Sequence, residues 1–112
     1  MRAMFGEYIR KLRNESRMTL TQLGAQLNID SGALSKIETG KKQLDEKALP
    51  KLAKVFDLNL EKLKDEFFSE KIAYAIYESG CSENVLMLAE EKVRYIKIKN
   101  TKQSKLKFTD KY

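Results

Sequence analysis

The sequence predicts an all-α protein in which five short helices are followed by a C-terminal helical extension. Three observations favour this fold class: apolar residues recur at steps of three and four, proline occurs once, and alternating apolar and polar runs are nearly absent. The chain has 112 residues, of which 42% are hydrophobic. This is enough for one compact core and an appendage.

Three short helices are predicted in residues 5–39 from apolar spacing and from capping residues at their ends. Thr19 is an N-cap candidate for the second helix, and Gln22 can complete a capping box with it. Asp30 can cap the third helix, which Gly40 ends. The inward-facing residues are Phe5, Ile9 and Leu12 over 5–17, then Leu20, Leu23 and Leu27, then Leu34 and Ile37 over 31–39.

Two further helices are predicted after these three. Asp45 is predicted to cap a fourth helix that starts near residue 47, because Pro50 then lies in the first turn, where proline removes no hydrogen bond. Asn59 begins a long fifth helix that ends at Ser79 and Gly80.

The C-terminal region is predicted to begin with a sixth helix, capped by Ser82. From Asn100 the sequence is rich in lysine, which indicates a tail, with a small hairpin over 95–108 as the alternative. The expected domains are a helical domain over 1–66, a helical extension over 67–99 and a basic tail over 100–112.

Charge is distributed unevenly along the chain, whose formal net charge is +6. Residues 1–58 hold 11 basic and 7 acidic groups, residues 59–91 hold 3 and 8, and residues 92–112 hold 8 and 1. Two basic segments separated by an acidic one can attract a polyanion such as a nucleic acid.

Several classes of protein do not fit this composition. The chain has no histidine and one cysteine, Cys81, so no intrachain disulfide and no Cys/His zinc site can form, and we expect no metal and no cofactor. Because histidine is absent and no nucleophile or phosphate-loop motif occurs, we expect no enzyme. No apolar run is long enough for a signal peptide or a membrane span, which predicts a cytoplasmic protein without membrane contact.

Residues 19–40 predict a helix-turn-helix unit, in which two short helices are joined by a tight turn and packed on a third. Gly24 leaves room for the second helix of the unit to approach. That helix enters the major groove of DNA, and the N-terminal amides of both helices offer phosphate donors. Small or basic side chains suit a helix lying among base edges. The outward-facing residues are Ser31, Gly32, Ala33, Ser35, Lys36 and Thr39.

The run from Met18 to Lys42 resembles the phage-repressor-like helix-turn-helix family, also called the xenobiotic-response-element type. Its most specific part is Ala-Leu-Ser-Lys-Ile-Glu-Thr-Gly-Lys-Lys, and the resemblance spans about residues 5–65. It implies a five-helix repressor-like domain, base contacts from the outward-facing residues, and a buried ion pair between Arg13 and Glu38. The implied contacts to the DNA backbone come from Thr21, Gln22, Lys41 and Lys42.

Two residues depart from the pattern of that family. Leu20 stands where members often have a phosphate-binding glutamine, so Thr21 or Gln22 would make that contact here. Gly24 stands where most members have alanine, which costs up to about 1 kcal/mol of helix propensity. The region from Phe67 to Val93 is also similar to extensions in regulators linked to restriction–modification genes.

Residues 67–98 hold more large apolar side chains than a helical domain of roughly 60 residues can cover. They either extend the core or form a dimer interface, and twofold symmetry would match a palindromic operator. We predict the interface at Phe67, Ile72, Ile76, Val85, Ala89 and Val93. The sequence therefore predicts a homodimeric transcriptional regulator, such as a repressor, that binds double-stranded DNA. The alternative is an antitoxin that neutralises a protein partner through residues 67–112 and represses its own promoter.

Overall fold

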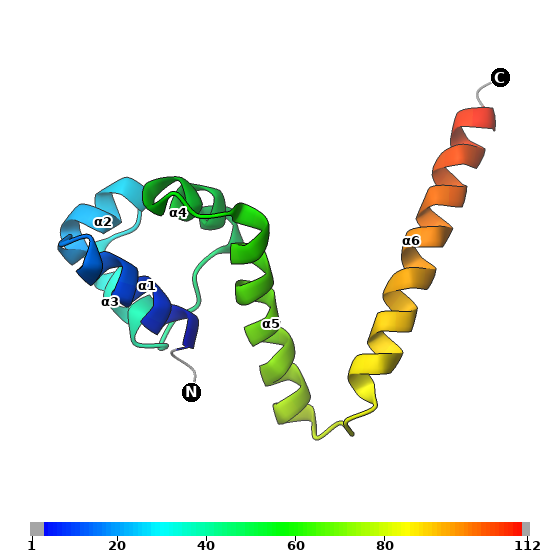
Figure 1. Cartoon of the computed structure of the whole chain (residues 1–112), viewed down its shortest axis with the longest axis horizontal. Helices are drawn as coiled ribbons and strands as arrows, with labels where there is room; N and C mark the ends of the chain where they lie inside the picture. Colours follow the sequence, from blue (N-terminus) through cyan, green and yellow to red (C-terminus); the bar gives the residue numbers. More distant parts are fainter. Residues whose placement is uncertain (1–3, 111–112) are drawn as a thin grey trace. The chain divides into compact units, whose positions relative to one another are not determined.

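The computed structural model describes the backbone of residues 4–110 and the side chains of residues 4–101. Every regular element in this part of the chain is a helix and none is a strand, which confirms the predicted fold class. The helices are α1 (Met4–Glu15), α2 (Leu20–Leu27), α3 (Ser31–Glu38), the 3₁₀ turn η1 (Glu46–Ala48), α4 (Leu49–Phe56), α5 (Leu60–Ser79) and α6 (Val85–Asp110) (Figure 1).

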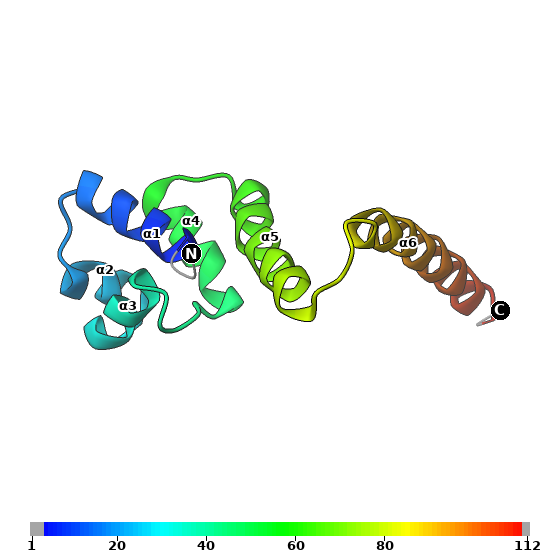
Figure 2. The ribbon, with the colours of Figure 1, turned by 90° about the horizontal axis from the view of Figure 1, so that it is seen from below.

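The chain divides into two compact units, Met1–Ala73 and Tyr74–Tyr112. The division falls inside α5, beyond the boundary expected after residue 66, because Phe67 and Glu70 still contact Phe5 of α1. The first unit contains the helix-turn-helix segment. The second contains the end of α5 and the whole of α6. Figure 2 shows α6 as one unbroken helix.

The core of the first unit takes apolar side chains from all five of its helices. Its buried residues are Phe5, Ile9, Leu23, Leu27, Leu34, Ile37, Leu44, Leu49, Leu52, Ala53, Leu63 and Phe67. The predicted inward faces of the first three helices are buried here, except that Leu12 and Leu20 are half-buried. Each fully buried leucine or isoleucine stabilises the fold by about 1.5–3 kcal/mol through the removal of apolar surface from water.

The predicted caps of α2 and α3 are present. Thr19 Oγ1 accepts a hydrogen bond from Gln22 N at 3.1 Å, and Gln22 Oε1 accepts one from Thr19 N at 2.8 Å, which completes the capping box. Asp30 Oδ2 accepts hydrogen bonds from the amides of Gly32 and Ala33. These bonds satisfy backbone donors that a helix leaves unpaired in its first turn.

The start of α4 follows the prediction in part. Asp45 caps η1 rather than α4, since its carboxylate accepts a hydrogen bond from Lys47 N at 3.0 Å. The α-helix itself begins at Leu49 and places Pro50 in its first turn. Asn59 begins α5 as predicted, because its Oδ1 accepts a hydrogen bond from Lys62 N at 3.0 Å.

α6 differs from the prediction at both ends. It begins at Val85, and Ser82 lies in the preceding turn, where its carbonyl accepts a hydrogen bond from Val85 N. It then continues through Asn100 to Asp110, where we expected a tail or a hairpin. Lysine, glutamine and leucine are good helix formers, and neither glycine nor proline interrupts this stretch. The last two residues of the expected tail, 111–112, lie outside the described residues.

No helix in residues 4–110 combines the length and the apolar content needed to cross a bilayer.

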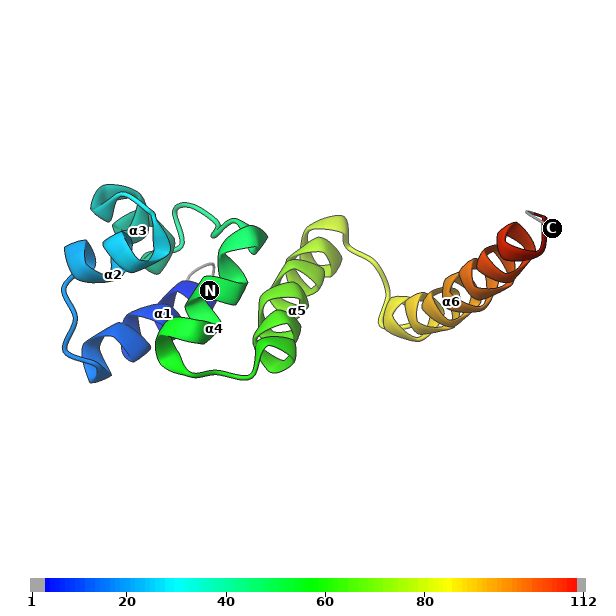
Figure 3. The ribbon, with the colours of Figure 1, turned by 90° about the horizontal axis from the view of Figure 1, so that it is seen from above.

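Gly24 allows the tight turn between α2 and α3, which lie next to each other in Figures 1 and 3. A Cβ atom at this position would lie 2.5 Å from the carbonyl oxygen of Ile29. The turn is closed by a hydrogen bond of 2.8 Å from Ile29 N to Gly24 O. Asn28 has a φ of 57°, a left-handed conformation that asparagine tolerates. In this chain the close approach at Gly24 leaves no room for a Cβ atom unless the backbone shifts, and the lower helix propensity of glycine is secondary.

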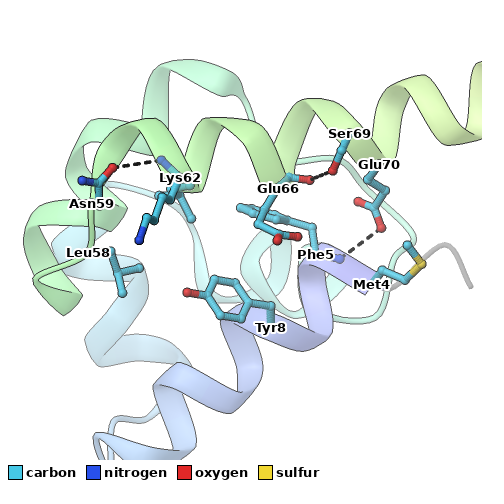
Figure 4. Close-up of a pocket in the computed structure, with 10 residues that line it drawn as sticks. Met4, Phe5, Tyr8, Leu58, Asn59, Lys62, Glu66, Ser69 and Glu70 are labelled. Carbon is cyan, nitrogen blue, oxygen red and sulfur yellow. Dashed lines mark hydrogen bonds between the residues drawn. The ribbon is translucent and has the colours of Figure 1, made fainter. Parts of the chain in front are cut away.

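α5 holds the first turn of α1 in place. Phe5 N donates a hydrogen bond to Glu70 Oε1 at 3.1 Å (Figure 4), and the Phe5 ring meets Phe67 edge to face with 5.3 Å between centroids. A cavity of about 450 Å³ lies between the two helices, beside the ring of Tyr8. These contacts make the first part of α5 an element of the N-terminal unit.

Replacing Gly24 with alanine is expected to destabilise the protein, although alanine is the better helix former. The steric overlap costs about 1–3 kcal/mol, which exceeds the gain of up to about 1 kcal/mol in helix propensity. Urea denaturation followed by circular dichroism measures the difference. Gln26→Ala, at an exposed position of the same helix, is the control and should leave stability unchanged or slightly raised. A Gly24→Ala protein more stable than the parent would contradict this account.

Candidate nucleic-acid interface

α3 presents its apolar side to the core and its polar side to solvent. Leu34 and Ile37 are buried in the core, so the helix is fixed on that side. On the opposite side Gly32 and Lys36 are exposed, while Ser31, Ala33 and Ser35 are half-buried. None of these five predicted contact residues is buried against protein, and the face of α3 is accessible to a partner molecule.

Exposed polar residues flank this face on both sides. They are Thr21 and Gln22 in the first turn of α2, and Thr39, Lys41 and Lys42 after α3. The segment after α3 folds back on the helix, because Lys41 N and Lys42 N both donate to Lys36 O, at 2.8 and 3.2 Å. Gly40 makes this possible with a φ of 79°. The two lysines are therefore held beside the end of α3.

Three amides in the first turns of α2 and α3 donate to side chains of the protein itself, so these three are not the free phosphate donors that the sequence predicts. The amides of Gly32 and Ala33 donate to Asp30 Oδ2 at 2.9 and 3.3 Å, and Gln22 N donates to Thr19 Oγ1. Helix N-termini attract anions through free amides and through the helix dipole. Here the carboxylate of Asp30 already occupies that place at the start of α3.

Two predicted contact side chains also make hydrogen bonds within the protein. Gln22 Oε1 accepts from Thr19 N, which leaves the side-chain amide nitrogen as the donor toward a phosphate. Thr39 Oγ1 lies 3.0 Å from Ser35 O and 3.2 Å from Lys36 O, and donates its proton to these carbonyls. The Thr39 hydroxyl therefore uses its proton within α3 and can only accept a hydrogen bond from a partner molecule.

A buried ion pair fixes α3 to α1. Arg13 Nε donates to Glu38 Oε2 at 2.8 Å and Arg13 Nη2 donates to Glu38 Oε1 at 3.0 Å. The third nitrogen, Nη1, donates to the carbonyl of Met18 at 2.9 Å in the segment before α2. The side chains are 12% and 4% exposed. The hydrogen bonds to Glu38 raise the pKa of Arg13 above its ordinary value, although burial acts in the opposite direction.

Two contributors to this arrangement were not predicted from the sequence. Gly6 lies in α1 where a Cβ atom would overlap the carbonyl oxygens of Ile37 and Glu38, so glycine lets α1 approach the end of α3. A glycine inside a helical apolar pattern is the one signal for such a contact. The carbonyl of Met18 has no sequence signal, because every residue has a carbonyl.

The residues predicted for a dimer interface lie in two different environments. Phe67 is buried in the core of the first unit, at 4% exposure, with its ring against Phe5. Its assignment to the interface was wrong, since a ring buried in its own chain cannot meet a second one. The remaining residues are Ile72, Ala89 and Val93, which are exposed, and Ile76 and Val85, which are half-buried.

Replacing Arg13 with methionine is expected to lower the free energy of unfolding by about 3–5 kcal/mol, because Glu38 would then be a buried charge without a partner. Urea denaturation measures this loss. Arg94→Met is the matched control: Arg94 pairs with Glu90 at 2.7 Å, but both side chains are mostly exposed. An exposed pair of this kind contributes about 1 kcal/mol or less. Equal losses in the two variants would count against a structural role for the buried pair.

Comparisons with known proteins identify the family of this chain. The helix-turn-helix family model matches residues 9–63. The chain is 30% identical over 106 residues to the HTH-type transcriptional repressor RghR of Bacillus subtilis (strain 168), covering 82% of this chain and 78% of that repressor. A solved structure of a SinR protein/SinI protein complex is similar over 87% of this chain and 98% of its own, with 24% identity and a TM-score of 0.48. The chain belongs to the helix-turn-helix family of DNA-binding transcriptional regulators.

Proposed function

We propose that the protein is a sequence-specific regulator that binds a palindromic operator as a homodimer, with α3 in the major groove. The observation that carries this proposal is the open polar face of α3. Leu34, Ile37 and Glu38 fix the helix from behind, while the predicted contact residues on the other side are accessible. A helix held in this way can enter a groove about 12 Å wide without rearrangement of the domain.

The side chains on α3 define which contacts are available to base edges. Ser35 can donate or accept a hydrogen bond, and Lys36 can reach the O6 and N7 acceptors of guanine. Ala33 can contact a thymine methyl group, and Gly32 lets the backbone approach closely. This set combines one charged donor with small residues, so specificity would depend on few direct hydrogen bonds and on close fit.

Contacts to phosphates would come from the flanks of the α3 face. Lys41 and Lys42 are exposed and held beside the end of α3, and the side-chain nitrogen of Gln22 is a donor at the start of α2. Each phosphate that a lysine neutralises steepens the dependence of log affinity on log salt by about 0.9. These contacts position the domain but do not distinguish sequences.

The dimer is supported by the exposed apolar side chains of the second unit and the end of the first. Ile72 is 51% exposed and Val93 is 47% exposed in the single chain. Water contact with so many apolar groups is unfavourable, and association removes it. A symmetric dimer would present two copies of α3 to half-sites one helical turn apart, about 34 Å.

The double variant Ser35→Ala/Lys36→Ala is expected to bind its operator more weakly, by roughly 1–3 kcal/mol for each base that the protein no longer reads. The operator is first selected from a random DNA pool with the parent protein, and fluorescence anisotropy then measures affinity. Lys64→Ala, which removes an exposed lysine from α5, is the control for net charge. If the double variant selects the same operator with the parent affinity, these residues do not read bases.

The variants Ile76→Asp and Val93→Asp are expected to be monomeric and to bind the operator weakly, because a charge in an apolar interface loses its hydration. Light scattering after size-exclusion chromatography measures the mass. Thr101→Asp, at an exposed site of α6, is the control for adding an aspartate. Variants that stay dimeric would place the interface elsewhere. A parent protein that is monomeric and captures a lysate protein through residues 67–112 would favour the antitoxin alternative.

A further inference from the structure

Residues 92–101 of α6 carry basic side chains and no acidic one, and we call them the basic segment. Two acidic residues, Glu90 and Glu91, come directly before it, and the helical backbone continues beyond it to Asp110. At a rise of 1.5 Å per residue the segment is about 15 Å long. Its exposed cations are Lys92, Arg94, Lys97 and Lys99.

The cations of the basic segment have few partners in their own chain. Among the described side chains, the amino groups of Lys92, Lys97 and Lys99 make no ion pair and no hydrogen bond. Arg94 Nη2 donates to Glu90 Oε1 at 2.7 Å, but the two side chains are 71% and 64% exposed. Solvent screens such a pair, and the guanidinium keeps further donors. The positive charge of the segment is therefore available to a partner molecule.

The same helix has an apolar stripe whose residues recur at steps of three and four: Leu86, Ala89, Val93 and Ile96. At 3.6 residues per turn, Lys92 and Lys99 lie along one edge of this stripe. Arg94 and Lys97 lie along the other edge. A second copy that covers the stripe therefore leaves the cations at the surface, and the proposed dimer and a basic contact do not compete for the same side chains.

A DNA duplex has the charge and the regularity that this segment fits. It carries one negative charge per about 1.7 Å of its axis, so a basic helix about 15 Å long can meet several phosphates. Lysine amino groups are point charges on flexible stems, which suits phosphates at any sequence and does not read bases. Because the two units are one chain, DNA bound by α3 holds the basic segment at a high effective concentration.

We propose that the basic segment of α6 is a second DNA contact, which binds phosphates of the duplex without regard to sequence. This inference rests on the proposed function and adds to it a source of affinity outside the helix-turn-helix unit. The phosphates are the same in the operator and in unrelated DNA, so the contact strengthens binding to both by the same factor.

The triple variant Lys92→Gln/Lys97→Gln/Lys99→Gln tests the contact and keeps the helix, because lysine and glutamine have similar helix propensities. The plot of log affinity against log salt should become shallower by about 0.9 for each lysine that contacts a phosphate. Affinity at physiological salt should fall roughly tenfold or more. The loss should be equal for the selected operator and for an unrelated duplex. Fluorescence anisotropy over a range of salt concentrations measures both.

A matched control separates a local contact from a change in net charge. Lys11→Gln/Lys62→Gln/Lys64→Gln removes the same charge from exposed positions of α1 and α5. This variant should keep the salt dependence of the parent. Light scattering establishes that both variants have the mass of the parent, because α6 also carries residues of the proposed dimer interface.

Photo-cross-linking tests the contact without removing any cation. In a Cys81→Ser background, a benzophenone group is attached at Thr101→Cys, an exposed position one turn after Lys97. It should cross-link to the operator and to unrelated duplex alike. Ser69→Cys, at an exposed position of α5, is the control and should cross-link to DNA much less. Cross-links to DNA that are no more frequent from residue 101 than from residue 69 would overturn the proposal, whatever the mass of the lysine variant.

The outcomes separate this contact from the proposed function. A parent protein that selects no operator from the random DNA pool contradicts the proposed function itself. If the parent selects an operator and the triple variant has the parent mass and salt dependence, that function stands and the contact by α6 is wrong. A loss confined to the operator also overturns it, because a phosphate contact acts on every duplex. Cross-links from residue 101 to protein alone would mean that the basic segment meets an acidic protein surface instead of DNA.

Discussion

The orientation of α3 depends on a pair of opposite charges that solvent barely reaches. Arg13 extends from α1 to Glu38 with two hydrogen bonds and uses its third nitrogen on the carbonyl of Met18. One side chain thus connects α1, the end of α3 and the segment that leads into α2. Removing either charge leaves the other buried without compensation, so the three elements keep one arrangement. The close contact at Gly6 has the same effect on the backbone, because it sets how near α1 and α3 can come.

Sequence reasoning succeeded where the deciding contact is local. The capping box of Thr19 and Gln22 and the cap by Asp30 each join residues no more than three positions apart, and residue type predicts such bonds. The pair of Arg13 and Glu38 is 25 residues apart, and only the family resemblance implied it. The outward side of α3 followed from its apolar spacing, but which of its polar groups are already bonded within the chain did not.

Contacts between distant segments could not be predicted in the same way. Phe67 is a large apolar residue in a region with apolar residues on several sides, and its type does not tell whether it meets its own chain or another. Its place in the core depends on Phe5 and on the bond from Phe5 N to Glu70, which joins residues 65 apart. The end of α6 was missed for a different reason. A lysine-rich stretch without apolar period is compatible with a helix and with a tail, since helix propensity differs little between such residues.

The cap at Asp30 bears on how strongly the regulator would bind DNA of unrelated sequence. The carboxylate of Asp30 bonds the amides of Gly32 and Ala33, so a phosphate that approaches the start of α3 would meet a negative charge beside these two amides. Attraction to phosphates is the same at every site of a chromosome, where unrelated sites outnumber the right ones by about 10⁶–10⁹. Under the proposed function, a weaker attraction to phosphates at this end would lower binding to unrelated sites and leave discrimination to the side chains of α3.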